Sequence, residues 1–180
     1  MRNTVTLLGN LLHPDHSSLS QHPKDVTSIR QYLICLLEDL QYVEETSIHH
    51  PESDALFHSL QVYQLALAQS NDPHLHCAAL LHDIGKSMDY PNHADVGADA
   101  IECYLSPKIV WLIRHHLDLL TRQKRTRRQW KGSKRLIDLE KLRRWDLQGR
   151  DVNAEVMCVT AAVDMLLRHY PVISDLSDNY

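Results

Sequence analysis

The sequence is poor in the features of β-sheets, membrane spans and secreted proteins. Only 5 of its 180 residues are glycine, and strand-like alternation of polar and apolar residues is scarce, which together favour helices. No stretch approaches 18 consecutive apolar residues, which argues against a transmembrane helix, and the N-terminal residues lack the layout of a signal peptide. The sequence therefore predicts a helical protein without membrane contacts.

The chain also lacks a large excess of positive or negative charge, and it lacks closely spaced pairs of cysteines. The formal net charge is only −4, so the molecule as a whole is not a general polyanion binder. Four cysteines are scattered through segments of helical pattern without any CxxC pair. They are expected to be reduced thiols in the core of a cytoplasmic protein: Cys35, Cys77, Cys103 and Cys158.

The length and the 43% apolar content fit one globular domain with a substantial core. We expect a loosely ordered arm over residues 1–25, a domain over 26–170 and a tail over 171–180. Ser53 and Asp72 are candidate helix N-caps, and Pro73 suits a first helical position. The apolar periodicity predicts about seven helices, over 28–44, 54–69, 73–85, 93–104, 107–120, 136–148 and 153–169, with a basic connector over 121–135.

Histidine is the unusual residue, with 13 copies. In "LLHDIGK", residues 80–86, an apolar run ends in adjacent His82 and Asp83. Buried His–Asp neighbours are costly unless they are paired or bound to something. Either this stretch is a surface turn, or the apolar run delivers ligands to a metal ion.

Other helices carry similar residues on their apolar faces when the 3.6-residue period is projected. A lone histidine there is usually a hydrogen-bonded core residue, and a lone aspartate usually caps a helix or pairs with arginine. Recurrence on five helices instead favours a shared site for Fe, Mn, Zn or a similar divalent ion. The candidates are His58, His82, Asp83, His93, His116 and Asp146; His115 lies on a different face of its helix.

The ordered set of His58, "HD" at 82–83 and Asp146 resembles the HD-domain superfamily of metal-dependent phosphohydrolases. The resemblance covers about residues 50–152 and is carried by "HHPESDALFHSLQVYQLA", "AALLHDIGK" and "LRRWDLQGRD". The first segment is similar to the HD region of bacterial tRNA nucleotidyltransferases, although nothing here resembles their nucleotidyltransferase head. The resemblance implies an all-α HD-domain bundle.

The resemblance also implies a dinuclear site. Members with two extra histidines hold two divalent ions (Fe, Mn, Zn, Co or Mg), and His93 and His116 occupy those positions, with Asp83 bridging. The doubled "HH" leaves His115 as an alternative to His116, which the helical stripe favours. Asp54 matches a third-metal carboxylate of some cyclic-dinucleotide phosphodiesterases. Because their GYP segment is missing here, we favour an ordinary first-turn helix residue.

The implied reaction is hydrolysis of a phosphomonoester or phosphodiester in a nucleotide-like substrate by a metal-bridging hydroxide. Asp83 and Lys86 are the expected catalytic residues, and Lys86 would also steady phosphate charge. A solvated lysine at a helix C-terminus is the alternative for Lys86.

A basic segment adds a candidate binding surface. "RQKRTRRQWKGSKR", residues 122–135, holds eight of the 19 basic residues. Arg122, Lys124 and Arg125 are expected to bind substrate, as an anion-attracting rim for a nucleotide or an RNA end. The alternative is a mobile solvated loop.

Two other functions stay open. HD-fold diiron oxygenases that act on phosphonates or polyols share the six-ligand arrangement, and "HADVGADAI" has some likeness to them. They use a mobile Tyr and Glu upstream of the first histidine, where this chain has Tyr42, Glu44 and Glu45. A regulatory HD module that binds a nucleotide without turnover is the other alternative, although such modules usually lose ligands.

Overall fold

A computed structural model describes residues 25–43, 54–178 and 180, and within these ranges it contains helices and no strands. The predicted all-α class is therefore confirmed. The expected arm over residues 1–25 lies almost entirely outside the described residues. The helices of the first half are α1 (Val26–Glu38), η2 (Asp39–Tyr42), α2 (Ala55–Gln69), α3 (Pro73–Leu81), η3 (Ile84–Ser87), η4 (Tyr90–Asn92) and α4 (His93–Ile101). Those of the second half are α5 (Pro107–His115), α6 (Asp118–Thr121), α7 (Gln123–Gln129), α8 (Lys134–Gln148), α9 (Val159–Leu167) and α10 (Tyr170–Ile173).

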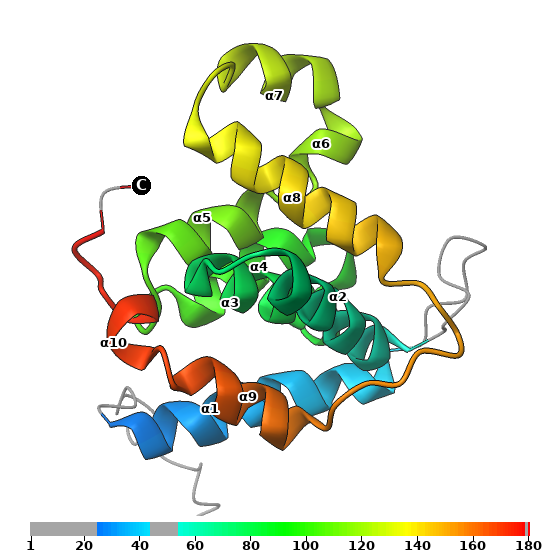
Figure 1. The fold of residues 1–180 in the computed structure, drawn as a ribbon, viewed down its shortest axis with the longest axis vertical. Helices are drawn as coiled ribbons and strands as arrows, with labels where there is room; N and C mark the ends of the chain where they lie inside the picture. The colour runs from blue at the N-terminus through cyan, green and yellow to red at the C-terminus, as the bar shows by residue number, and fades with distance from the viewer. Residues whose placement is uncertain (1–24, 44–53, 179) are drawn as a thin grey trace, which may run out of the picture.

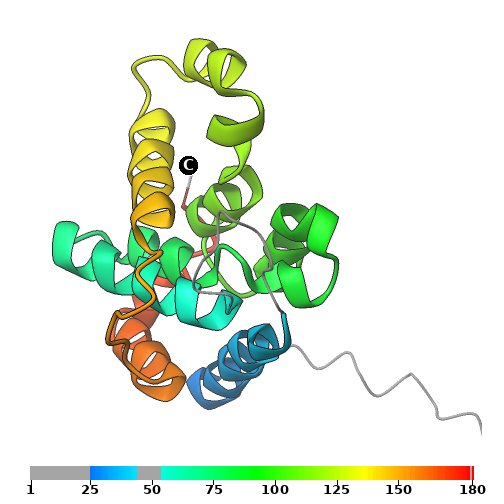
Figure 2. The ribbon, with the colours of Figure 1, turned by 90° about the vertical axis from the view of Figure 1, so that its right-hand side faces the viewer.

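The helices form three tiers (Figure 1). α1 and α9 lie side by side at one end, α2 to α5 fill the middle, and α6, α7 and α8 stand at the other end. The view from the side shows α8 rising from the middle tier towards α7 (Figure 2). The middle tier therefore has neighbours on both sides, and its helices can bury polar side chains.

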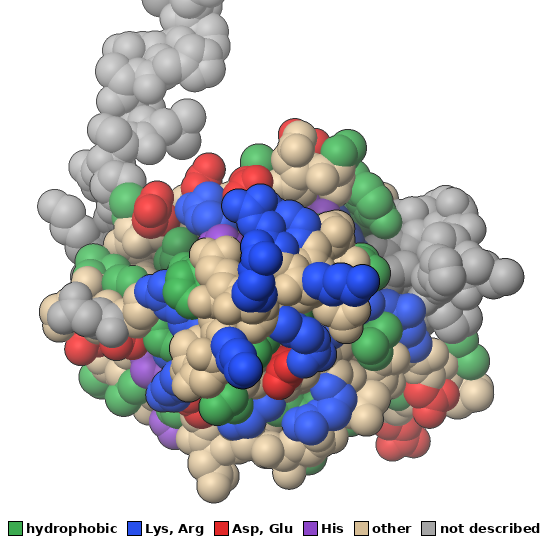
Figure 3. Space-filling view, turned by 90° about the horizontal axis from the view of Figure 1, so that it is seen from above, with side chains coloured by type: hydrophobic (Ala, Val, Ile, Leu, Met, Phe, Trp, Pro, Cys, Tyr) green, Lys and Arg blue, Asp and Glu red, His purple; other side chains and the backbone are tan. Residues whose placement is uncertain are grey.

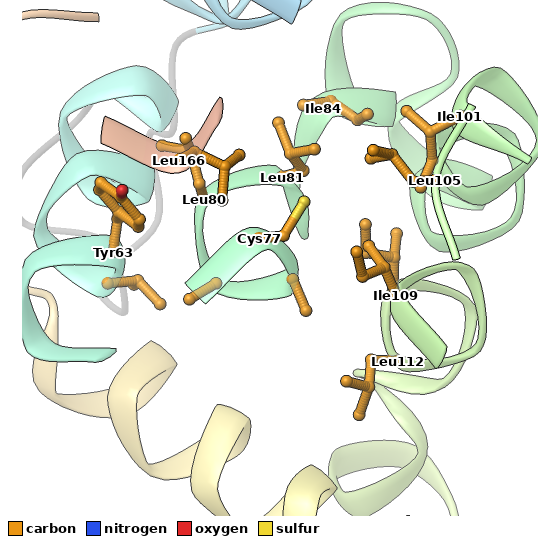
Figure 4. Close-up of a cluster of buried hydrophobic side chains, with 14 of the residues drawn as sticks. Tyr63, Cys77, Leu80, Leu81, Ile84, Ile101, Leu105, Ile109, Leu112 and Leu166 are labelled. Atoms are coloured by element: carbon orange, nitrogen blue, oxygen red, sulfur yellow. The ribbon is translucent and has the colours of Figure 1, made fainter. Parts of the chain in front are cut away.

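α3 is the central helix of the core. Its Cys77, Leu80 and Leu81 are fully buried, with Tyr63 of α2 on one side and Ile109 of α5 on the other (Figure 4). Nearly every residue of α3 is buried, which matches its apolar and small composition. A helix enclosed in this way holds whatever follows its last turn at a fixed position in the interior.

Side-chain caps fix where the helices begin. Asp72 accepts a hydrogen bond from His74 N at 3.0 Å, so the predicted cap and start of α3 are confirmed. Asp54 caps α2 by accepting from Leu56 N and Phe57 N. The other predicted cap, Ser53, lies outside the described residues.

The chain departs from the predicted helices at several places. The predicted 153–169 helix begins only at Val159, as α9, because the preceding backbone bonds to the side chains of Gln61 and Gln64 in α2. α3 ends at Leu81, before Gly85, because Asp83 adopts φ −106° and ψ 3°. The predicted 107–120 helix is broken after His115, which separates α5 from α6. The basic connector is not a loop: α7 and the start of α8 are helical, because their long side chains suit a helix.

The prediction of four core thiols is wrong for three of them. Only Cys77 is buried, whereas Cys35, Cys103 and Cys158 are exposed and all four are free. Cys35 lies on the outer face of α1, and the other two lie just outside helix ends. A scattered cysteine therefore carried no information about burial in this chain. None of the helices in the described ranges combines the length and apolar character that a membrane crossing requires.

The C-terminal segment packs against the middle tier. The predicted domain boundary at residue 170 falls at the start of α10, whose Ile173 is fully buried and accepts a hydrogen bond from Ser106 N at 2.8 Å. Tyr180 donates to Asp138 at 3.2 Å. The side chains around Lys108 join α3, α5 and α8 here.

Lys108 forms a buried charge cluster with two carboxylates. It is 2% exposed, and its Nζ lies 2.5 Å from Asp72 and 3.2 Å from Asp138. Burial of Asp72 opposes its ionisation, but hydrogen bonds from His74 and Lys108 outweigh burial and lower the pKa of Asp72. The ionised carboxylate therefore stabilises the folded state.

We expect Asp72→Asn to lower the free energy of unfolding by about 2 kcal/mol at pH 7. Asparagine is an equally good helix cap, so the loss reports the charge. Because the folded-state pKa is lowered, the contribution is complete above the unfolded value of 3.8 and declines as the pH falls below it. Urea unfolding of both proteins at several pH values checks this: a difference that grows towards acidic pH would contradict it.

Candidate metal centre

Five helices bring six histidine and aspartate residues to one place. His58 comes from α2, and the pair His82 and Asp83 follows the last turn of α3. His93 begins α4, His116 follows the last residue of α5, and Asp146 belongs to α8. All six are buried, with relative exposures between 0% and 8%: His58, His82, Asp83, His93, His116 and Asp146. The structure thus brings together all six residues of the main predicted ligand set.

The break after α3 lets neighbouring residues serve one site. On a continuous helix, successive side chains point about 100° apart. His82 keeps helical angles, whereas Asp83 leaves them. As a result both side chains reach the same space, with His82 Nε2 3.2 Å from Asp83 Oδ2.

The Asp83 carboxylate divides its two oxygens between two pairs of histidines. Oδ2 lies 3.9 Å from His58 Nε2 and 3.2 Å from His82 Nε2. Oδ1 lies 3.3 Å from His93 Nε2 and 3.7 Å from His116 Nε2. The donor atoms form two groups of three that share Asp83, each within 4.8 Å. One carboxylate oxygen per group is the arrangement that a bridging ligand needs.

Backbone carbonyls orient all four rings. The Nδ1 atoms of His58, His82, His93 and His116 lie 2.6–3.0 Å from the carbonyl oxygens of Gly149, Ala79, Tyr90 and Ile113. A carbonyl can only accept, so each Nδ1 carries the proton, and in the neutral ring Nε2 carries the lone pair. This second contact is typical of metal-binding histidines.

The donor set fits divalent cations. His82 Nε2 is buried and has no hydrogen-bond partner among the described residues. His93 Nε2 and His116 Nε2 face each other at 3.2 Å. Two neutral imidazoles tautomerised in this way would point lone pairs at one another, which costs energy unless a proton or a cation lies between them. Imidazole nitrogen with carboxylate oxygen suits Zn, Fe or Mn.

The pKa values of the paired histidines move in opposite directions. Burial disfavours the charged form of His93, but Asp83 raises its pKa above the usual value. Burial and the neighbouring His82 lower the pKa of His116 to about 4. His116 is therefore neutral at physiological pH and offers an unprotonated nitrogen.

Asp146 lies beside the His58 end of the cluster. Its Oδ1 is 3.3 Å from His58 Nε2, and its Oδ2 accepts from Arg143 at 2.6 Å. Arg150 lies 3.7 Å away. Burial opposes ionisation of Asp146, but the hydrogen bond with His58 helps to lower its pKa. Asp146 belongs to neither group of three, so its role as a ligand stays a prediction.

Lys86 is not a solvated residue, so that alternative is wrong. It is 8% exposed, and its Nζ lies 2.7 Å from Asp83 Oδ2. Burial disfavours the charged Asp83, but His82 and Lys86 together hold the pKa of its carboxyl well below the usual value. Lys86 is therefore an internal countercharge for the shared carboxylate.

Two candidates lie elsewhere. His115 packs on Trp111 and lies 3.0 Å from Asp118. Asp54 uses its carboxylate as the α2 cap and is in neither group of donors, which matches a helix-start residue. Tyr42 is 80% exposed, and Glu44 and Glu45 of the oxygenase pattern lie outside the described residues.

A cavity of about 490 Å³ opens onto the cluster. None of the predicted substrate residues Arg122, Lys124 and Arg125 lines it. Lys86, which was also predicted to contact the substrate phosphate, does line the cavity. Its other cations are Arg143 and Arg150, and its wall includes Tyr90. In the sequence, Arg143 and Arg150 lie three and four residues from Asp146, a spacing that is typical of ion pairs and does not by itself indicate a cavity wall.

We expect His116→Ala to lower the metal content by about one ion per chain. The matched control is His115→Ala, which removes the neighbouring ring and should leave the metal content at the wild-type value. Elemental analysis of both purified variants decides between the two histidines. Metal loss in His115→Ala with retention in His116→Ala would reverse the assignment.

Comparisons with known proteins agree with this geometry. A family model described as "HD domain" matches residues 56–162. A multifunctional CCA protein from Nitrosococcus oceani is 34% identical over 74 residues, which are 39% of this chain and 18% of that protein. The chain thus spans about a fifth of the length of that relative. The family match covers more than half of the chain. The chain therefore belongs to the HD domain family, which is part of a superfamily of metal-dependent phosphohydrolases.

Proposed function

We propose that this chain hydrolyses a phosphomonoester or phosphodiester of a nucleotide-like substrate, using two divalent metal ions. The observation that carries the proposal is the Asp83 carboxylate, which presents one oxygen to each of two histidine pairs. A site for two cations side by side is suited to phosphoryl groups, because their negative charge is distributed over several oxygens.

The cavity supplies the remaining requirements for such a substrate. Arg143 and Arg150 are partly exposed on its wall and match phosphate oxygens in charge and geometry. The Nε atom of Arg150 is buried without a hydrogen-bond partner among the described residues. Leu117, Leu120 and Leu147 give the same cavity an apolar side, which fits the uncharged part of an ester.

The ions, when bound, would acidify water and neutralise charge on the phosphoryl oxygens. The protein's own residues are already arranged to bind these ions. The four carbonyl contacts hold the rings with Nε2 towards Asp83, so little reorganisation is needed. Lys86 keeps Asp83 ionised. Arg150 is positioned to bind a phosphate oxygen, and Arg143 holds Asp146 in place.

The test is elemental analysis of protein purified without chelator, followed by assays of phosphate release and oxygen uptake. Two ions per chain with phosphate release from p-nitrophenyl phosphate or nucleotides would support the proposal. Oxygen uptake by an iron-loaded protein, without phosphate release, would assign it to the diiron oxygenases. Nucleotide binding without either activity after metal reconstitution would assign it to the regulatory modules.

A further inference from the structure

The basic residues are concentrated on one end of the molecule. Residues 122–135 hold eight lysines and arginines and no acidic residue, so the rest of the chain carries a formal charge of −12. In the structure these residues form α7 and the start of α8. Viewed from that end, many Lys and Arg side chains gather near the centre of the face (Figure 3). One end of the molecule is therefore strongly cationic although the net charge of the whole chain is low.

A groove lies between α7 and α8 and adjoins the cavity. It has a volume of about 700 Å³, and Arg127, Arg143 and Arg144 line it with Glu140 as its one acidic residue. Arg143 and Leu147 line both this groove and the cavity at the metal centre. The two spaces are therefore neighbours that share a wall, and a long anion could occupy both.

Several cations on this end are not used by the fold. Lys124, Arg128, Lys131 and Arg144 are exposed and make no ion pair among the residues that the structure describes. Exposed like charges repel one another and contribute nothing to stability on their own. Phosphate groups spaced along a polymer would relieve this repulsion.

Apolar side chains lie between these charges. Leu120 and Leu147 are 58% and 49% exposed. Leu120 lines the cavity, and Leu147 lines cavity and groove. Unstacked bases of a single strand can pack on such side chains, whereas a duplex keeps its bases inside.

We propose that the groove binds a single-stranded oligonucleotide and guides its phosphorylated end into the cavity. The proposed binding of the single strand depends on the groove alone. Only the hydrolysis of its terminal phosphate rests on the proposed function. There, water would attack the terminal phosphorus, the P–O bond to the sugar would break, and the sugar oxygen would leave with a proton. The products are inorganic phosphate and an oligonucleotide with a free hydroxyl.

Binding is measured by fluorescence anisotropy with a labelled single strand of about ten nucleotides that carries a terminal phosphate. Chelator is present, so turnover does not interfere. The test variant is Arg127→Gln/Arg144→Gln, which changes the groove and leaves the cavity intact. The matched control is Arg30→Gln/Arg168→Gln. Both variants remove two charges and one exposed ion pair, Arg127–Glu140 in the first and Arg30–Asp164 in the second.

The groove variant should bind at least about fivefold more weakly, and its slope of log affinity against log salt should fall by about 1.4. The control should bind like the wild type. In the metal-loaded protein, the groove variant should raise KM for the oligonucleotide and leave p-nitrophenyl phosphate hydrolysis unchanged.

Equal binding by the groove variant and the wild type would overturn the inference. So would binding to anionic phosphatidylserine vesicles without binding to the oligonucleotide, which would assign the surface to a membrane. Weakened binding without any phosphate release would uphold the groove and refute the proposed function, so the two failures are distinguishable.

Discussion

Replacing Asp83 with asparagine is expected to abolish phosphate release, with a loss of about 10³-fold or more, and to remove bound metal. The aspartate gives one oxygen to His58 and His82 and the other to His93 and His116. The asparagine amide keeps one oxygen and replaces the other by an NH₂ group, which donates hydrogen bonds and does not coordinate cations. The charge between the two donor groups also disappears.

Folding must be separated from function in this experiment. Asp83→Asn removes a buried anion next to the buried Lys86, and breaking such a pair is often strongly destabilising. The double variant Asp83→Asn/Lys86→Met removes both charges, so it should regain stability while metal binding and activity stay lost. Asp95→Asn, on the exposed side of α4, is the control. An Asp83→Asn protein that keeps two ions and wild-type turnover would contradict the dinuclear assignment.

Gly85→Ala is expected to lower the free energy of unfolding by about 3 kcal/mol. Gly85 lies where η3 crosses α4. A Cβ atom there would press against the carbonyl oxygen of His93 and lie 2.7 Å from Gly97 N. These are backbone atoms, which cannot rotate away as a side chain can. One of the two elements must shift, and the same shift would move His93 away from Asp83.

Urea unfolding measures this effect, with Gly132→Ala as the comparison. Gly132 has φ +75° and open space around its Cβ position. Alanine there should cost only about 1 kcal/mol, for the backbone conformation alone. A loss at Gly85 no larger than at Gly132 would show that the crossing of η3 and α4 can relax.

Much of the fold followed from local patterns in the sequence. The apolar period located α2, α4 and α8 to within a few residues, and Asp72 with Pro73 fixed the start of α3. These signals act within one helix turn. The break after His115 and the helix α7 were not predicted, because a run of arginine and lysine gives no apolar period to follow.

The candidate site, like the fold, could be predicted from the sequence only in part. Periodicity alone placed His58, His93 and His116 on the inward faces of their helices, and all three are buried in the structure. It also preferred His116 to His115, whose ring lies against Trp111. The sequence by itself thus determined which polar residues face the core, because a helix repeats every 3.6 residues whatever its surroundings.

Only the tertiary structure decided how these faces meet. The division of the Asp83 oxygens between two histidine pairs depends on the angles between α2, α4 and α5. The burial of Lys86 depends on the packing of η3 against α4. The arginines of the cavity come from α8 and the residues after it, and not from 122–125, because the orientation of one helix towards another is set by long-range packing that no local pattern records.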